Sequence, residues 1–491
     1  MIIVTRSLPR RSNKAPRYRL CYPDTGVNQI GHCVWEGESE AGRTVVLERG
    51  YEVDDLAFAR VFLTPIPPEL ADLIDVALAV YTLDRLSPRK RPGYQQAEEA
   101  WQRSLEVCVP IRDPRRWERS NVRSGLEQLL NNLTDDQWTF QFSERQGPRR
   151  ASELHQALLS FPFDHSPSVC LFSGGLDSLA GSVGYLLRNP DRHLICVAGS
   201  TSEWISSVQA GLATGVMIRF HDRVTLLRVP FHLTSPGQGT WQEESSQRAR
   251  GFTHLILGVV AAELAAVKAL IVHENGVGAL NLPYTGAQFG AHMSRAMHPL
   301  VLAEATKWLS TYLGHPFRIF STGLSLTKAQ ACGDLLEADL ANLAAQSLSC
   351  DGFQRVAGQH HCGTCTSCLL RRQSIYVSGL SRFDNPKQYR FDVTDPEALI
   401  PEHRLVGLRL MLDQLSVLDR CLATVDPWRA LVNVFPELHE LEARGEEWRY
   451  VGGSGLPSNS IPALYRAYVD EWEQFPISPS LSHIVRMGRA A

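Results

Sequence analysis

The sequence lacks a long hydrophobic run and a strong net charge of either sign. No apolar stretch reaches the roughly 18 residues needed to cross a bilayer. The basic N-terminal segment is not followed by an apolar stretch as long as that of a secretory signal peptide. The formal net charge over 491 residues is −3, so no global basic field favours binding to bulk nucleic acid. These absences predict a cytoplasmic protein without a membrane partner, for which nucleic acid is not the expected direct substrate.

A disulfide scaffold is also not expected, because 11 cysteines are thinly spread over so long a chain. Four of them crowd between Cys350 and Cys368, which indicates metal ligation in a reducing compartment. Cys332 lies in an apolar helical run and is expected in the core. The other six are isolated in the sequence and are expected to be packing residues: Cys21, Cys33, Cys108, Cys170, Cys196 and Cys421.

The chain divides into three parts. Residues 1–160 form an α+β appendage in which no catalytic motif is found, residues 166–376 alternate strand-like and helical runs, and residues 377–491 are mostly helical. In the first part, one clear helix is expected near residues 121–133, and the basic clusters at residues 89–91 and 115–116 are expected to be solvated loops. The strands expected there are residues 43–48, 61–64, 105–111 and 138–142.

The central part has the pattern of a parallel sheet that helices cover on both faces. Short β runs are expected at residues 169–172, 193–198, 224–229 and 269–273. The helices expected between them are residues 176–188, 202–213 and 251–268. The predicted fold class is therefore α/β, with an N-terminal α+β domain and a helical C-terminal region added to it.

One strand-to-helix turn of the central part is made of small and polar residues. Residues 173–178 read SGGLDS, after an apolar run and before a helix. Glycines let backbone N–H groups converge on one point, and the helix directs its positive dipole end there. The turn favours a phosphate cradle, although a simple capped turn is the alternative. Its residues are Ser173, Gly174, Gly175, Leu176, Asp177 and Ser178. The carboxylate of Asp177 suits a Mg²⁺ ion on a polyphosphate, and the Walker A spacing with its lysine is absent.

A second motif lies downstream, where Cys350, Cys362, Cys365 and Cys368 form the pattern C-x11-C-x2-C-x2-C. Two-residue gaps let neighbouring thiolates converge on one ion, and the distant cysteine completes a tetrahedron. The pattern favours a structural zinc site, and an iron–sulfur cluster is the alternative. The adjacent His360 and His361 are expected to be solvated loop residues, and replacement of a cysteine ligand by one of them is the alternative.

The two motifs together resemble one known family. The SGGLDS turn is similar to the PP-loop of the N-type ATP pyrophosphatases, and the stretch HCGTCTSCLLR is similar to the zinc motif of the 7-cyano-7-deazaguanine synthase (QueC) family within them. Residues 324–330, LSLTKAQ, resemble the family's Thr-Lys-x-Glu segment, with Gln330 in place of Glu. The resemblance spans residues 169–376. It implies a HUP-like (adenine nucleotide alpha hydrolase-like) fold that cleaves ATP between the α and β phosphates and adenylates a carboxylate.

The chain also departs from that family. It is about twice as long, and residues 273–301 lack the family's Tyr-Pro-Asp-Cys-Arg segment. The enlarged form resembles the QueC-like proteins of bacterial anti-phage operons, the Qat system among them. That resemblance implies a 7-carboxy-7-deazaguanine substrate, transfer to an amine at the N-terminus of a partner protein, and partners from the same operon. The alternatives are a 7-cyano-7-deazaguanine synthase of queuosine precursor synthesis and, in another class, a nucleotide-sensing or tRNA-binding subunit.

The resemblance also suggests roles for residues outside the two motifs. Arg248 and Lys328 are the candidate cationic contacts with the phosphates of ATP, and an exposed ion pair is the alternative for each. Gly199 and Ser200 follow the second strand, where this fold family receives adenine. Glu274 or Asn275 is expected to read the purine-like edge of the substrate, with local capping as the alternative. The expected cofactors are ATP, Mg²⁺ and Zn²⁺.

Overall fold

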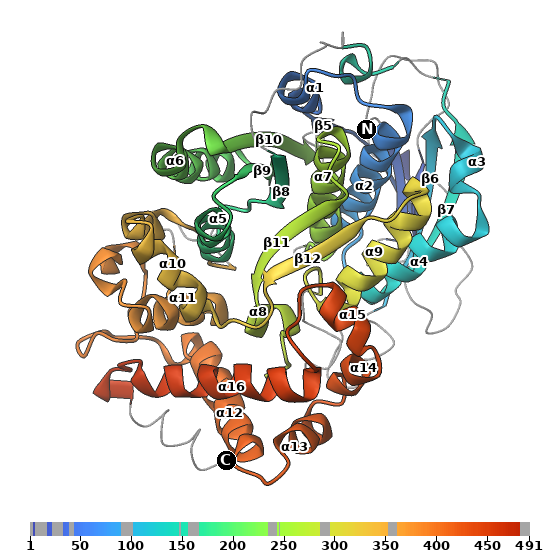
Figure 1. Ribbon diagram of the computed structural model, residues 1–491. Coiled ribbons are helices and arrows are strands. Elements are labelled where there is room, and N and C mark those ends of the chain that lie inside the picture. Colours follow the sequence, from blue (N-terminus) through green and yellow to red (C-terminus); the bar gives the residue numbers. More distant parts are fainter. Residues whose placement is uncertain are drawn as a thin grey trace.

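Figure 1 shows the computed structural model of the chain. The structure describes residues 3–4, 17–21, 33–38, 44–89, 102–146, 149–155, 166–233, 243–244, 246–284, 295–351 and 361–481. Within these residues, the strands form two six-stranded sheets, and helices lie between and around them.

The first sheet belongs to the N-terminal region and is mixed. Its first four strands are antiparallel, and the last two run parallel to their neighbours. In spatial order the strands are β1 (Ile3–Val4), β4 (Thr44–Arg49), β3 (Cys33–Glu38), β2 (Arg17–Cys21), β6 (Ser104–Ile111) and β7 (Gln137–Glu144). Side chains along β6 alternate between buried and partly exposed, so one face of this sheet packs on the core.

The second sheet is parallel except for one edge strand, which confirms the predicted mixed α/β class with a mostly parallel sheet. In spatial order its strands are β12 (Arg318–Gly323), β11 (Ala269–Asn275), β8 (Ser166–Leu171), β9 (Arg192–Ser200), β10 (Val224–Leu233) and β5 (Tyr51–Val53). The chain builds β8, β9 and β10 outward in one direction and then returns to place β11 and β12 on the other side of β8. The strand order therefore reverses between β8 and β11, and in such sheets ligands bind beyond the carboxyl ends of the strands at this point.

Helices cover both faces of the second sheet (Figure 1). One face carries α5 (Leu176–Arg188), α6 (Glu203–Phe220) and α10 (Lys328–Glu337), and the other carries α7 (Arg250–Leu264) and α9 (Pro299–Leu313). The predicted strands and helices of the central part are confirmed. The strand β12 was not predicted. The short helix α8 (Gly276–Leu280) follows β11 directly.

The N-terminal region is built onto the second sheet rather than standing apart from it. Its strand β5 pairs with β10, and α2 (Pro68–Leu86) packs against α7. Trp117 of α3 (Pro114–Trp117) meets Tyr312 of α9 with ring centroids 4.6 Å apart. The predicted helix near residues 121–133 is α4 (Ser120–Thr134). The predicted strand at residues 61–64 is wrong, because this segment is the end of α1 (Leu56–Phe62) and the turn after it.

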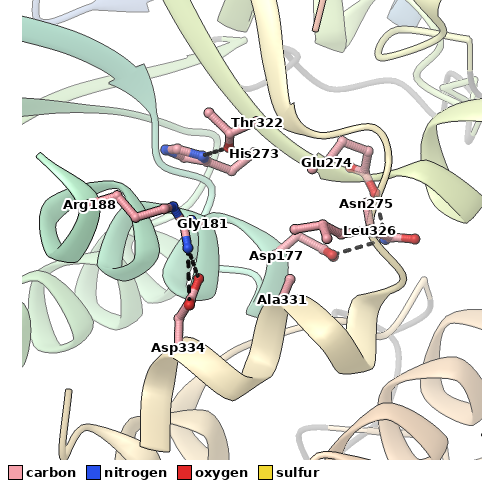
Figure 2. Close-up of a pocket in the computed structure, with 11 residues that line it drawn as sticks. Asp177, Gly181, Arg188, His273, Glu274, Asn275, Thr322, Leu326, Ala331 and Asp334 are labelled. Atoms are coloured by element: carbon pink, nitrogen blue, oxygen red, sulfur yellow. Dashed lines mark hydrogen bonds and ion pairs between the residues drawn. The ribbon is translucent and has the colours of Figure 1, made fainter. Parts of the chain in front are cut away.

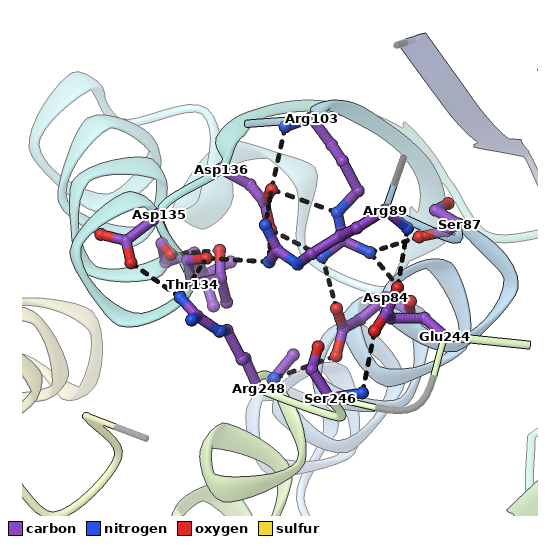
Figure 3. Close-up of polar contacts among 12 residues, drawn as sticks. Asp84, Ser87, Arg89, Arg103, Thr134, Asp135, Asp136, Glu244, Ser246 and Arg248 are labelled. Atoms are coloured by element: carbon purple, nitrogen blue, oxygen red, sulfur yellow. Dashed lines mark hydrogen bonds and ion pairs between the residues drawn. The ribbon is translucent and has the colours of Figure 1, made fainter. Parts of the chain in front are cut away.

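A buried ionic cluster joins the N-terminal region to the start of α7 (Figure 3). Arg103 is fully buried and donates hydrogen bonds to the carboxylates of Asp84 and Asp136, both at 2.6 Å. Arg89 is buried as well and is bidentate to Asp136. The prediction of a solvated loop is therefore wrong for Arg89, while residues 90–91 lie outside the described residues. It is wrong for Arg116 too, because this side chain donates to the Tyr312 carbonyl at 2.9 Å.

The C-terminal region is mostly helical, as predicted. After α11 (Thr366–Val377), which ends the central part, this region contains α12 (Val406–Leu422), α13 (Pro427–Val434), α14 (Leu438–Ala443), α15 (Gly445–Tyr450) and α16 (Pro457–Gln474). The helix α16 runs across α11 and α12 (Figure 1). Across the described segments, no helix combines the length and the apolar character needed to span a membrane.

Candidate functional site

The glycine loop, residues 173–178, turns from β8 into α5 at the point where the strand order reverses. Gly174 has a φ of 81°, a conformation that glycine adopts without strain. Gly175 is the N-cap of α5, and among the described residues no side chain caps this helix end. The hydroxyl groups of Ser173 and Ser178 lie 3.2 Å apart beside it. The N–H groups of the first helical turn have no partner within the helix, so the loop presents donors and a positive dipole end to one point.

The residues next to the loop hold its carbonyl oxygens. Gln209 of α6 donates to the carbonyls of Gly199 at 2.9 Å, Ser173 at 3.3 Å and Phe172 at 3.4 Å. Leu348 donates its backbone N–H to the Gly174 carbonyl at 2.9 Å. The sequence analysis did not identify Gln209, because a glutamine inside a helical run carries no recognisable signal.

Asp177 lies at the centre of a small polar network (Figure 2). Its carboxylate accepts from the Asn275 side-chain amide at 2.9 Å and forms an ion pair with the Lys328 ammonium at 2.7 Å. The three residues come from α5, β11 and α10. Lys328, a predicted phosphate contact, therefore pairs with an acidic residue of the loop, and this ion pair is largely buried rather than exposed.

Burial and mutual charge set the protonation of this network. Burial together with the Asp177 carboxylate raises the pKa of Glu274 to about 8. Burial lowers the pKa of Lys328, but the Asp177 and Glu274 carboxylates outweigh it and raise that pKa overall. At neutral pH, Glu274 is therefore mainly a neutral acid that can donate a hydrogen bond, and Lys328 is a cation balanced by Asp177.

Asn275 has a local role, which was the alternative for this residue. Its side-chain oxygen accepts from the Gly278 N–H at 2.9 Å and so caps α8, while its amide nitrogen contacts Asp177 and Glu274. Both ends of the side chain are thus engaged inside the protein. Both residues predicted to read the substrate edge, Glu274 and Asn275, line one pocket.

That pocket lies between α5, α10 and the ends of β11 and β12 (Figure 2). His273 lines it and accepts or donates at Nδ1 with the Thr322 hydroxyl at 2.8 Å. Its Nε2 is buried and has no hydrogen-bond partner among the described residues. An ion pair between Arg188 and Asp334, 3.1 Å long, lies at the rim. His273 was not among the predicted site residues, although it ends the same predicted strand as Glu274.

The other predicted residues differ in their placement. Gly199 and Ser200 end β9, and Gly199 is tied to the loop through Gln209. The Ser200 hydroxyl is buried without a partner among the described residues. Arg248 does not contact the loop: its guanidinium pairs with Asp135 at 2.7 Å, at the edge of the ionic cluster in Figure 3. The predicted phosphate contact of Arg248 is corrected accordingly, because the residue lies at the start of α7, on the opposite face of the sheet from α5.

The segment that carries Lys328 is fixed by a capping box. The Thr327 hydroxyl accepts from the Gln330 N–H at 3.1 Å, and the Gln330 side chain accepts from the Thr327 N–H at 2.9 Å. Gln330 can therefore do what glutamate does at this position of a capping box. The Thr327 hydroxyl also donates to Glu471 of α16, so the C-terminal region supports the start of α10.

The four cysteines of the second motif converge. The Sγ atoms of Cys350, Cys362, Cys365 and Cys368 all lie within 4.8 Å of one another. The Sγ atoms of Cys362 and Cys368 are 3.9 Å apart, close to the roughly 3.8 Å expected between ligands of a tetrahedral zinc with Zn–S bonds of about 2.3 Å. The cluster can therefore hold a metal ion such as zinc. The prediction of a solvated histidine is wrong for His361, which is buried and stacks on Tyr389 with ring centroids 4.9 Å apart. His360 lies outside the described residues.

The cysteine cluster and the glycine loop are joined through one short segment. Arg371 of α11, the helix that contains Cys368, is fully buried and donates to the Ser347 hydroxyl and the Ala344 carbonyl, both at 2.6 Å. Leu348, the residue after Ser347, donates the hydrogen bond to the Gly174 carbonyl described above. The helix that supplies a cysteine ligand thus also fixes the segment that holds the loop.

No protein-family model matches the chain, and no curated protein matches it either.

Proposed function

We propose that this protein is an ATP-dependent ligase that activates a carboxylate as its adenylate, releases pyrophosphate and passes the acyl group to an amine. The observation that carries the proposal is the ion pair of Asp177 with Lys328 beside the uncapped N-terminus of α5. Anions bind at such helix ends, and a carboxylate beside an anion site is explained if it holds Mg²⁺.

Each group of the glycine loop has a role in this reaction. The N–H groups of the first turn of α5, with the Ser173 and Ser178 hydroxyls, would hold the β and γ phosphates. Asp177 would be the protein ligand of Mg²⁺, which supplies positive charge against the charge that develops on the phosphate oxygens. Lys328 balances Asp177 in its present contact and offers its ammonium to the phosphates once the carboxylate binds a metal.

We place the group that carries the reacting carboxylate at the pocket beside Asp177. The neutral Glu274 acid supplies a hydrogen-bond donor at the wall of this pocket. We propose a 7-deazaguanine carboxylate, 7-carboxy-7-deazaguanine, as the substrate, on the resemblance of the two motifs to the QueC family. The acceptor amine is proposed to be the N-terminus of a partner protein from the same anti-phage operon.

The cysteine cluster would hold Zn²⁺ with a structural role. All four proposed ligands are thiolates, which leaves no open position for chemistry. Its contribution to the reaction is to hold the segment of Leu348, and thereby the loop.

The decisive experiment measures pyrophosphate release from ATP and Mg²⁺ with and without 7-carboxy-7-deazaguanine. We expect release that depends on the deazaguanine, and AMP rather than ADP as the nucleotide product. Asp177→Asn should abolish it. Asp135→Asn is the matched control, because it removes a carboxylate that pairs with Arg248 on the opposite face of the sheet, away from the loop and the pocket. ADP and orthophosphate as products would contradict the proposal.

The acceptor is identified by intact-mass spectrometry of the neighbouring operon proteins after the same incubation. We expect an added mass on one partner. A free nitrile formed with ammonia would instead identify a 7-cyano-7-deazaguanine synthase. ATP binding without turnover would identify a sensor, and tRNA binding with a steep salt dependence would support a tRNA-directed role.

A further inference from the structure

Two cysteines that are far apart in sequence lie opposite each other on the first sheet. Cys21 of β2 and Cys108 of β6 are register partners in a parallel pair. Neighbouring strands lie about 4.8 Å apart, which falls within the Cα separation of about 4.4–6.8 Å that a disulfide spans. Both thiols are free and partly exposed, whereas the preceding residues on each strand, Leu20 and Val107, are buried. The two thiols therefore share the outer face of the sheet.

Two neighbours, Cys21 and Arg19, favour ionisation of the Cys108 thiol. Arg19 lies on the same face, two residues before Cys21, and its guanidinium donates to Cys108 Sγ at 3.4 Å. The hydrogen bond from Cys21 and, beyond it, the contact with Arg19 lower the pKa of Cys108 to about 6 against the effect of burial. The same contact raises the pKa of Cys21. These contacts favour ionisation of Cys108 over that of Cys21, whereas the nearby Glu106 carboxylate opposes it. The pair thus has the arrangement of an attacking and a resolving cysteine.

The chain contains a second pair of the same geometry that serves as an internal comparison. Cys170 of β8 and Cys196 of β9 are also register partners on parallel strands, with Sγ atoms 3.7 Å apart. Both are completely or almost completely buried in the core beneath α5 and α6. A soluble oxidant reaches the outer face of the first sheet but not this core. The two pairs therefore share the same strand register and differ in their exposure to solvent.

We propose that Cys21 and Cys108 are a redox-active dithiol, which a hydroperoxide oxidises to a cross-strand disulfide. The Cys108 thiolate attacks a peroxide oxygen, the O–O bond breaks, and Cys108 becomes a sulfenic acid as hydroxide leaves and takes up a proton. The Cys21 thiol then gives up its proton and attacks the Cys108 sulfur, and the S–S bond forms as the second hydroxide leaves as water. With hydrogen peroxide, two thiols and one peroxide give one disulfide and two waters. A dithiol reductant reverses the reaction.

This site is independent of the proposed ligase activity. It uses residues of β2 and β6 in the N-terminal region, whereas the glycine loop follows β8 in the second sheet. The sequence analysis treated both cysteines as isolated packing residues, because nothing local indicates that positions 21 and 108 meet. Only the parallel pairing of β2 with β6 brings them together.

The test treats the full chain with hydrogen peroxide, blocks remaining thiols with N-ethylmaleimide after denaturation, and maps peptides by mass spectrometry without reduction. We expect a peptide linking Cys21 to Cys108, which dithiothreitol removes, while Cys170 and Cys196 are recovered as separate alkylated thiols. Zinc release, followed in parallel with a chromogenic chelator, reports oxidation of the cysteine cluster separately.

Three variants test the assigned roles. In Cys21→Ser, the sulfenic acid on Cys108 should persist and be trapped by dimedone, whereas Cys108→Ser should give no dimedone adduct at Cys21. Arg19→Gln should slow the reaction of Cys108 at pH 7 several-fold, because less of the thiol is ionised. Near-UV circular dichroism of each variant checks the fold. Equal oxidation of the two cysteine pairs, or a disulfide to any other cysteine, would overturn the proposal.

Discussion

Gly174→Ala is the substitution that most directly tests whether the glycine loop binds ATP. The backbone at Gly174 has a φ of 81°, and an L-residue in this left-handed region costs about 1–2 kcal/mol. A Cβ there would also lie 3.1 Å from Cγ of Gln209. That side chain is flexible enough to move, but it holds three carbonyl oxygens around the loop. We therefore expect two effects: a modest loss of unfolding free energy and a displaced loop.

Gly314 provides a matched control for the first effect. It ends α9 with a φ of 79°, and a Cβ on it would meet no atom within 4 Å. Gly314→Ala should therefore lose about the same 1–2 kcal/mol of unfolding free energy without disturbing the loop. The unfolding free energy is measured by urea denaturation without nucleotide, and ATP affinity by isothermal titration calorimetry with Mg²⁺.

The two variants should then differ only in binding. We expect Gly174→Ala to weaken ATP at least about tenfold, which corresponds to about 1.4 kcal/mol, and Gly314→Ala to bind ATP as the unmodified chain does. Unchanged ATP affinity in Gly174→Ala would refute the assignment of the loop. Equal losses of affinity in both variants would show that the effect comes from general destabilisation.

Four further predictions concern the surroundings of the loop. The folded-state pKa of Glu274, about 8, exceeds its ordinary value of 4.5, so the stability that Glu274 contributes is complete below pH 4.5 and is lost as the pH rises through 8. The unfolding free energy of Glu274→Gln should therefore rise relative to that of the unmodified chain between pH 5 and 9. Parallel curves of unfolding free energy against pH would contradict this. Arg371→Met should lower the unfolding free energy measured by urea denaturation by at least about 3 kcal/mol. Each hydrogen bond from a charged donor contributes about 1.5–3 kcal/mol, and three buried acceptors lose their hydrogen bond to Arg371. Gly181→Val should block binding of the carboxylate substrate in calorimetry, since a Cβ at Gly181 would lie 2.5 Å from His273. Chelation of the metal should speed hydrogen exchange at the Leu348 amide, and an unchanged rate would show that the cysteine cluster does not support the loop.

The elements that could be predicted from the sequence are those with a local pattern. The helix α5 was predicted with its observed bounds, because its apolar spacing and the preceding glycines are both local. The helix α2 was missed, although it is the longest helix described. It is buried on all sides between the two sheets, so it has no polar face to give a helical period. In the sequence, Asp72, Asp75 and Asp84 make this segment look exposed to solvent. In the structure they are buried, and arginines from other segments neutralise their charges.

The candidate site shows the same limit. Lys328 and Arg248 were both candidate phosphate contacts, Lys328 as the lysine of the Thr-Lys segment and Arg248 as a basic residue at the start of a predicted helix. Their fates differ because α10 follows β12 and packs beside α5, whereas α7 lies on the opposite face against the N-terminal region. The face that a helix covers depends on strand order, and strand order is set by pairing between distant segments. Motif spacing carries none of this information.

The link between the two motifs explains why the loop can face an anion at all. A tight turn exposes carbonyl oxygens as readily as N–H groups, and a carbonyl directed at a phosphate would repel it. Here the carbonyls are engaged within the protein: that of Gly174 by Leu348, those of Ser173 and Gly199 by Gln209, and that of Gly175 by the Ser178 hydroxyl. The N–H groups of the first turn of α5 are thereby left as the polar backbone groups for a ligand. Leu348 lies two residues before Cys350. A metal held by the cysteines would therefore keep the loop carbonyls turned inward and the N–H groups of α5 free for a ligand, without touching the nucleotide.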